Sequence, residues 1–207
     1  IYALQRDTDE RISTSALADQ LEVSPGSVTA MVKKLEERGL VDREEYRGVT
    51  LTGEGEAVAL ELLRHHRLIE TFLTERLGYD WSEVHEEADV LEHHVSERFE
   101  ERVAAALDNP RTDPHGDPIP DADLRLSGAT AGPTLDELET DERFVVRRIR
   151  HQGEAELRYL ADRGIRPGAE LVVEALAPFG MVEVTTETGH HELPGEIARL
   201  VEGERAE

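Results

Sequence analysis

Apolar and polar positions over residues 14–39 predict two short helices joined by a tight turn. The first apolar set recurs at helical spacing and consists of Leu17, Ala18 and Leu21. The second set has the same spacing and consists of Val28, Met31, Val32 and Leu35. Ser24 suits the N-cap of the second helix, Pro25 its first position, and Gly39 its C-terminal end.

The segment after Gly39 predicts a two-stranded hairpin. Leu40-Val41 and Val49-Thr50-Leu51 are strand-like, and a polar turn through Tyr46, Arg47 and Gly48 separates them. Helix, turn, helix and hairpin in this order are typical of a winged helix-turn-helix, which we assign to residues 1–52. An unrelated small helical domain is the alternative, because helix pairs are common.

A winged helix predicts which side chains meet DNA. Short polar or small residues at the start of the second helix can approach base edges and phosphates; they are Ser24, Ser27, Thr29 and Ala30. Nearby cations can contact the phosphate backbone; they are Lys33, Lys34, Arg43 and Arg47. An ordinary solvated face would account equally well for any one of these cations.

Residues 53–110 predict a helical domain with two long helices, about 53–76 and 81–107. Asp80 with Glu83 three residues later suggests a cap for the second helix, and Asn109-Pro110 ends it. An apolar stripe follows that second helix and consists of Val84, Ala88, Leu91, Val95, Phe99 and Val103. The stripe is wider than a helix hairpin needs, so we expect a homodimer interface.

The rest of the chain predicts a linker and a small β-rich domain. Residues 111–133 are rich in Pro, Asp and Gly and show almost no periodicity, which indicates a linker. In residues 134–207 the segments 144–146, 170–176 and 181–185 are strand-like, and 154–161 predicts a short helix. The expected fold class is therefore mainly α and multi-domain, with a barrel-like β module at the C-terminal end.

Charge and cysteine content narrow the possible partners. The formal charge is −23, but residues 1–52 carry only −3 of it, and both lysines of the chain lie in the predicted recognition helix. An acidic, lysine-poor composition fits a protein adapted to high salt, where the screening length falls to about 3 Å near 1 M. The absence of cysteine leaves His, Asp and Glu as metal ligands. No apolar run is long enough for a membrane span or secretion signal, so we expect a cytoplasmic protein.

Histidines and carboxylates in the helical domain suggest a metal site. Five of the nine histidines lie between His65 and His94. His66 and Glu70 share one helix face, and a second face holds His85, Asp89, Glu92 and His93. Together they offer the nitrogen and oxygen ligands that divalent Mn, Fe or Zn requires, for one or two ions. A solvated acidic face is the alternative.

These motifs resemble the diphtheria toxin repressor and manganese transport regulator family of metal-dependent repressors. The similar segments occur in family order and are His66-Arg67-Leu68-Ile69-Glu70, Val84-His85-Glu86-Glu87-Ala88-Asp89, Leu91-Glu92-His93 and Gly116-Asp117-Pro118-Ile119-Pro120. The resemblance covers nearly the whole chain and implies an SH3-like, FeoA-like C-terminal domain. It also implies one metal site with His66, Glu70 and His85 and another with Asp89, Glu92 and His93, which could merge through His66.

Departures from the family pattern affect the expected metal. The resemblance implies a ligand from a first helix that would begin before Ile1, so we expect that ligand outside this sequence. Asp89 stands where the iron-responsive type has cysteine, which favours Mn²⁺ without excluding Fe²⁺. A glutamate expected in the C-terminal domain aligns with Gly153, so we take its neighbours Glu154 and Glu156 as candidate ligands.

The resemblance implies a repressor that binds a palindromic operator in double-stranded DNA as a homodimer when Mn²⁺ or Fe²⁺ is bound, and that controls metal-uptake genes. It implies no enzyme activity and no membrane partner. A metal-independent winged-helix regulator with a partner-binding C-terminal module is one alternative. A dinuclear metallohydrolase with Glu86 or Glu87 as base is the other.

Overall fold

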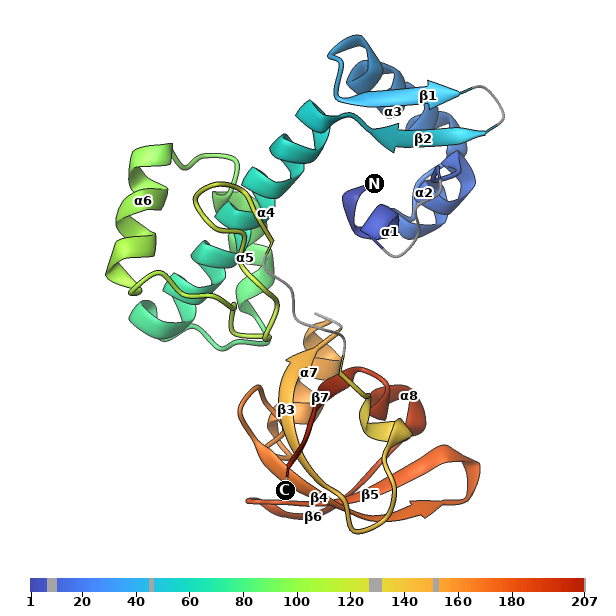
Figure 1. Cartoon of the computed structure of the whole chain (residues 1–207), viewed down its shortest axis with the longest axis vertical. Helices are drawn as coiled ribbons and strands as arrows, with labels where there is room; N and C mark the ends of the chain where they lie inside the picture. Colours follow the sequence, from blue (N-terminus) through green and yellow to red (C-terminus); the bar gives the residue numbers. More distant parts are fainter. Residues whose placement is uncertain (7–10, 45–46, 127–131, 151–152, 207) are drawn as a thin grey trace. The chain divides into compact units, whose positions relative to one another are not determined.

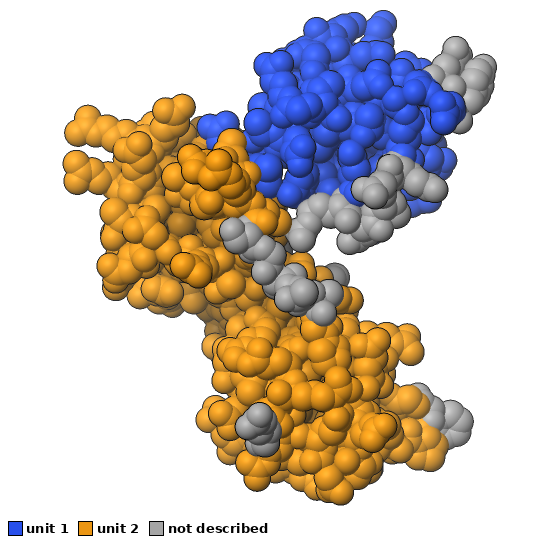
Figure 2. All heavy atoms as spheres, viewed as in Figure 1, with its two compact units in different colours: residues 1–62 blue, residues 63–207 orange. Residues whose placement is uncertain are grey.

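The structure is a computed structural model that describes residues 1–6, 11–44, 47–126, 132–150 and 153–206. It divides into two compact units, Ile1–Leu62 and Leu63–Glu207, which Figure 2 shows in different colours.

The first unit contains the predicted winged helix-turn-helix (Figure 1). Its elements are α1 (Tyr2–Arg6), α2 (Thr14–Gln20), α3 (Pro25–Glu37), β1 (Val41–Glu44) and β2 (Gly48–Leu51). The two strands pair antiparallel from Val41 opposite Leu51 to Glu44 opposite Gly48. Ser24 caps α3 as predicted, because its side chain accepts a hydrogen bond from the Ser27 N–H. The predicted turn residue Tyr46 lies outside the described residues.

Fewer apolar residues of this unit are buried than the apolar pattern predicts. Val28 and Val32 of α3 are buried against Leu17 of α2 and the two strands. Leu21 and Met31, which share the helical spacing, are 51% and 52% exposed. A helix rotates by about 100° per residue, so Met31 lies at the flank of the face that Val28 and Val32 bury.

The helical part of the second unit differs from the two long helices expected. Helix α4 (Gly53–Phe72) continues from the first unit and ends in a π-helical turn, η1 (Leu73–Leu77). The expected helix over 81–107 is two helices, α5 (Val84–Leu91) and α6 (Glu97–Ala106). Ser96 is the N-cap of α6: its backbone is extended, and its side chain accepts a hydrogen bond from the Phe99 N–H.

The break divides the predicted apolar stripe. Val84 and Ala88 are buried with Ile69 and Leu73, whereas Val103 belongs to a separate cluster around Leu68. Phe99 is 48% exposed. The stripe is therefore not one continuous face, because residues 92–96 redirect the chain between the helices.

The first part of the predicted linker is packed into the second unit. Asp113, His115, Asp117 and Ile119 are all buried, and Ile119 joins the cluster around Leu68. This segment has no helix or strand, so its lack of periodicity does not mean that it is solvated.

The C-terminal part forms an antiparallel five-stranded sheet in the order β6-β5-β4-β3-β7. In chain order its elements are η2 (Leu135–Glu137), β3 (Arg143–Ile149), α7 (Glu154–Ala161), β4 (Glu170–Ala177), η3 (Pro178–Gly180), β5 (Met181–Thr186), β6 (Gly189–Leu193), α8 (Gly195–Ala198) and β7 (Val201–Ala206). The sheet curves around its core with α7 and α8 (Figure 1). Strands β6 and β7 and helix α8 were not expected from the sequence. None of the helices in the described residues is long and apolar enough to cross a membrane.

Candidate metal centres

Three ligand atoms meet between α4 and α5. His66 Nε2 lies 3.0 Å from Glu70 Oε1, on the next turn of α4, and 3.0 Å from His85 Nδ1 on α5. The Glu70 oxygen lies 3.1 Å from the same His85 nitrogen. Sides of this length match the spacing between neighbouring ligands of an octahedral site with bonds of about 2.1 Å. His66 and Glu70 are buried and His85 is half-buried, so the triangle is partly shielded from solvent.

The other nitrogen of His66 faces two more carboxylates. His66 Nδ1 lies 2.8 Å from Glu92 Oε2 and 3.3 Å from Asp89 Oδ1. Asp89 also lies 3.8 Å from His85 through its second oxygen. One imidazole thus stands between two groups of ligands. We call these five residues, His66, Glu70, His85, Asp89 and Glu92, the His66 cluster.

The charges within the His66 cluster shift the pKa values of its members in opposite directions. Burial disfavours the charged form of His66, but hydrogen bonds and charges of Glu70 and Glu92 raise its pKa to about 9. Burial likewise opposes ionisation of Glu70, yet hydrogen bonds from His66 and His85 lower its pKa to about 2. A hydrogen bond with Glu70 raises the pKa of His85 against the effect of burial. The cluster therefore attracts positive charge, which here is a proton on His66.

Glu70 also belongs to a second group of ligands that sequence analysis missed. Its side chain is completely buried, and Oε2 lies 3.8 Å from His115 Nδ1, while that nitrogen lies 3.9 Å from Asp113 Oδ1. We call Glu70, Asp113 and His115 the His115 cluster. The candidate ligand atoms lie within 4.8 Å of one another in the His115 cluster and in each of the two groups of three that share His66. Glu70 connects the two clusters, since its oxygens face different ones.

The buried polar atoms of the His115 cluster have the chemistry of cation ligands, and they do not form hydrogen bonds with one another. Glu70 Oε2, Asp113 Oδ2 and His115 Nδ1 are buried without a hydrogen-bond partner among the described residues. His115 Nε2 lies 2.8 Å from the Trp81 carbonyl oxygen, an acceptor, so the proton of neutral His115 is on Nε2 and Nδ1 has a free lone pair. Burial and the charges of Asp117 and Glu70 raise the pKa of Asp113 to about 8. A bound divalent cation would relieve this repulsion.

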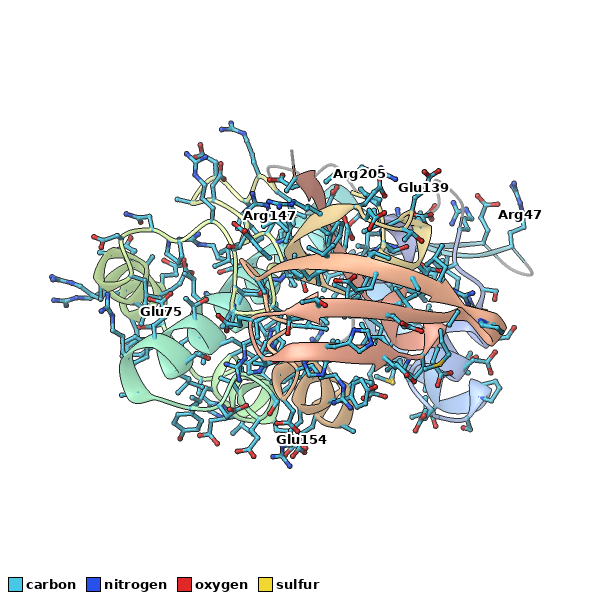
Figure 3. The ribbon with its side chains drawn as sticks, turned by 90° about the horizontal axis from the view of Figure 1, so that it is seen from below. Arg47, Glu75, Glu139, Arg147, Glu154 and Arg205 are labelled. Atoms are coloured by element: carbon cyan, nitrogen blue, oxygen red, sulfur yellow. The ribbon has the colours of Figure 1, made fainter. Side chains whose placement is uncertain are left out.

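Three predicted ligands are not brought into these groups. His93 follows the end of α5, and its side chain is 61% exposed and lies 3.5 Å from Glu92. The helical spacing that placed it beside His85 does not apply beyond Leu91. Glu154 is exposed at the start of α7, where it pairs with Arg158 at 2.8 Å, and Figure 3 shows it at the outer side of the helix. Neither Glu154 nor Glu156 belongs to a candidate ligand group in the described residues.

The predicted DNA-contacting residues lie on the surface of the first unit. Along α3 and its cap the exposed ones are Ser24, Ser27, Thr29, Ala30, Lys33 and Lys34. Arg43 of β1 is half-buried. Arg47, at the start of the β2 side of the hairpin, points away from its domain (Figure 3) and pairs with Glu44 at 2.7 Å.

Comparison with known proteins matches three family models to successive parts of the chain. Residues 1–49 match the family described as iron dependent repressor, N-terminal DNA binding domain. Residues 52–121 match its metal binding and dimerisation domain, and residues 134–205 match the FeoA domain. The iron-dependent repressor IdeR of Mycobacterium tuberculosis (strain ATCC 25618 / H37Rv) is 34% identical over 91% of this chain and 87% of its own length.

The chain belongs to the diphtheria toxin repressor family of iron-dependent repressors. The diphtheria toxin repressor of Corynebacterium efficiens (strain DSM 44549 / YS-314 / AJ 12310 / JCM 11189 / NBRC 100395) is 32% identical over 92% of this chain and 86% of its own length. The family and fold expected from the sequence motifs are thereby confirmed, including the FeoA domain.

Solved structures of repressors agree with this family. A manganese-dependent transcriptional repressor in complex with manganese superposes with a TM-score of 0.87 at 38% identity, covering 100% of this chain and 96% of that one. ScaR with bound Cd²⁺ has a TM-score of 0.78 at 34% identity, covering 95% of this chain and 92% of that one. This repressor-family chain therefore shares its fold with proteins whose structures contain divalent metals.

Proposed function

We propose that the protein is a transcriptional repressor that binds operator DNA when Mn²⁺ or Fe²⁺ occupies the His66 cluster. The observation that carries this proposal is the pair of ligand groups on either side of His66 in the helical domain, one with Glu70 and His85 and the other with Asp89 and Glu92, in a chain that also has a winged helix. We propose a cytoplasmic protein that acts on genes for metal uptake, as the family resemblance implies.

The ligand set favours hard or borderline divalent ions. Every ligand of the His66 cluster is an imidazole nitrogen or a carboxylate oxygen, and the chain has no cysteine. Such donors suit Mn²⁺ and Fe²⁺, and Asp89 in place of a thiolate favours Mn²⁺. Relatives support both ions, since IdeR is named iron-dependent and a structural neighbour is named manganese-dependent. His93 remains a predicted ligand beside Glu92.

The His115 cluster would hold a second ion. Its three buried atoms, which make no hydrogen bond among the described residues, would gain ligand bonds, and the charge of the cation would offset Glu70 and Asp113. Because Glu70 contributes one oxygen to each cluster, occupation of one site changes the charge experienced at the other. One or two ions per subunit therefore follow from this arrangement. Glu154 and Glu156 stay candidate ligands only from the sequence.

DNA binding is assigned to α3 and the hairpin. The N-terminal turns of α3 expose Ser27, Thr29 and Ala30 for the major groove, while Lys33, Lys34, Arg43 and Arg47 would neutralise phosphates. A homodimer of this kind reads two half-sites of a palindrome. Metal acts by binding more tightly to the DNA-competent state, so its differential affinity sets the population shift. The proposal assigns no catalytic step to any residue.

Two coupled measurements test this function. Equilibrium dialysis without oxygen, in high salt, should give saturable Mn²⁺ and Fe²⁺ binding that Glu92→Ala weakens. Glu101→Ala, an exposed position on α6, serves as the matched control. Selection of bound fragments from genomic DNA should enrich a palindrome with Mn²⁺ and lose it after chelation. Enrichment of the same sequence without metal would show a metal-independent regulator instead.

A further inference from the structure

The loop that holds the second candidate ligand set touches the C-terminal domain at its main chain. His115 belongs to residues 113–117, and its carbonyl oxygen accepts a hydrogen bond from the Ile149 N–H of β3 at 2.9 Å. Gly116 comes so close to the same strand that a Cβ would lie 2.0 Å from the Arg147 carbonyl oxygen. Its φ of +87° is also one that other residues rarely adopt. The loop and β3 therefore fit together only with glycine at this position.

An ion pair joins the same two segments. Arg148 Nη2 of β3 lies 2.5 Å from Asp117 Oδ1 in an ion pair, and Asp117 is almost fully buried. Asp117 in turn donates its backbone N–H to Asp113 Oδ1 at 2.9 Å, and Asp113 accepts the His115 N–H at 2.8 Å. The chain of contacts runs from the guanidinium of β3 to two ligands of the His115 cluster.

The ring of His115 also contacts Trp81, a residue that is buried in the core of the C-terminal domain. The Trp81 ring stacks on the His115 ring at 5.4 Å between centroids, and the Trp81 carbonyl oxygen accepts a hydrogen bond from His115 Nε2. Trp81 itself is buried in the same hydrophobic cluster as Phe144, Leu157 and other core residues of the C-terminal domain. Arg166 lies over the Trp81 ring at 5.2 Å. His115 therefore contacts β3 directly through the Ile149 N–H, and it also contacts Trp81, whose side chain packs into the core of this domain.

We propose that the C-terminal domain sets the metal affinity of the His115 cluster by positioning its ligands, with Arg148 as the main positioning side chain. The candidate ligand groups in the described part of the chain contain no residue of this domain. The contacts of the domain with the loop run through Asp117, Ile149 and Trp81. This inference rests on the proposed function, because it takes the His115 cluster as a metal site.

The coupling is reciprocal. If docking of the domain places Asp113 and His115 for a cation, then the cation stabilises the docked domain by the same free energy. Contacts behind metal ligands typically change metal affinity about 10- to 100-fold when removed. Arg148→Ala removes the 2.5 Å ion pair and leaves buried Asp117 with the longer contact to Arg67 at 3.6 Å, so the effect belongs in this range.

The test is a Mn²⁺ titration of the full chain followed by the fluorescence of Trp81, the only tryptophan of the sequence. Mn²⁺ at the His115 cluster is expected to quench this ring, which stacks on a ligand. Arg148→Ala should weaken the quenching transition about 10-fold or more, and Arg148→Lys should restore part of it. Arg147→Ala is the matched control, since that exposed neighbour pairs with Glu204 inside its own sheet (Figure 3).

A second readout separates positioning from general destabilisation. Hydrogen exchange at the Ile149 amide should slow on addition of Mn²⁺ in the unchanged protein and in Arg147→Ala, but not in Asp113→Asn, which lacks a ligand. Equal Mn²⁺ affinity in Arg148→Ala and Arg147→Ala would overturn the positioning role while leaving the metal site in place. No quenching by Mn²⁺ in the unchanged protein, with Mn²⁺ still bound by dialysis, would remove the His115 cluster as a metal site and this inference with it.

Discussion

Mn²⁺ binding at the His66 cluster should release at least one proton. Without metal, the pKa of His66 is about 9, so its ring is protonated near neutral pH and donates to both Glu70 and Glu92. A metal ligand must offer a free nitrogen lone pair, and the ion therefore competes with this proton. Each pH unit below 9 then costs about 1.4 kcal/mol, or about tenfold in affinity. Between about pH 6.5 and 8.5 the affinity should rise about 100-fold or more.

Calorimetric titration of Asp113→Asn with Mn²⁺ isolates this effect. The backbone N–H groups of His115 and Asp117 both donate to Asp113 Oδ1, which an asparagine retains. The amide group replaces Oδ2, which makes no hydrogen bond among the described residues. The substitution also removes the second acid whose raised pKa would add to the slope. Titrations in two buffers with different ionisation enthalpies count the released protons. An affinity that stays constant from pH 6.5 to 8.5 would refute the reasoning, because His66 would then be unprotonated.

Four further outcomes follow from individual contacts. Because the pKa of His66 is raised from 6.5 to about 9, protonated His66 stabilises the metal-free fold fully below about pH 6.5, and this stabilisation disappears as the pH rises through 9. It contributes at most about 3 kcal/mol to the free energy of unfolding. An unchanged melting temperature at pH 6 and 9.5 would contradict it. Lys34→Ala should weaken binding to all DNA sequences and lower the salt slope by about one, measured by fluorescence anisotropy against salt. Ser24→Ala should cost about 1 kcal/mol in urea unfolding, since it removes the cap of α3. Gly55→Ala should destabilise the first unit by about 1–3 kcal/mol, because its Cβ would lie 1.8 Å from the Leu40 carbonyl oxygen. Gly53→Ala is the control: its Cβ would meet nothing within 4 Å, so it should be neutral in the same assay.

The winged helix and much of the first ligand set could be predicted from the sequence because they depend on local spacing. The cap, proline and glycine around α3 define its ends without reference to the rest of the chain. His66 and Glu70 share a face because they are four residues apart in a helix. His85 and Asp89 share a face of α5 for the same reason, and Glu92 follows as the C-cap residue of that helix.

The helix break after Leu91 shows a limit of this reasoning. An apolar period continues through residues 92–96, so the pattern alone extends the helix and carries His93 onto the ligand face. The available signal was Ser96 followed by acidic residues in the first turn of α6. An N-cap residue inside a periodic segment can start a new helix, or the first helix can continue through it. Here two helices form, because α5 and α6 pack into different hydrophobic clusters.

Only the tertiary structure revealed Asp113 and His115 as candidate ligands. They lie in a segment without helix or strand, whose composition resembles a solvated linker. Their positions depend on Trp81, Arg67 and β3, which lie far away in the sequence. Spacing along the chain predicts which residues share a helix face. An irregular loop has no such rule, because each of its backbone angles is fixed by the surface against which it packs.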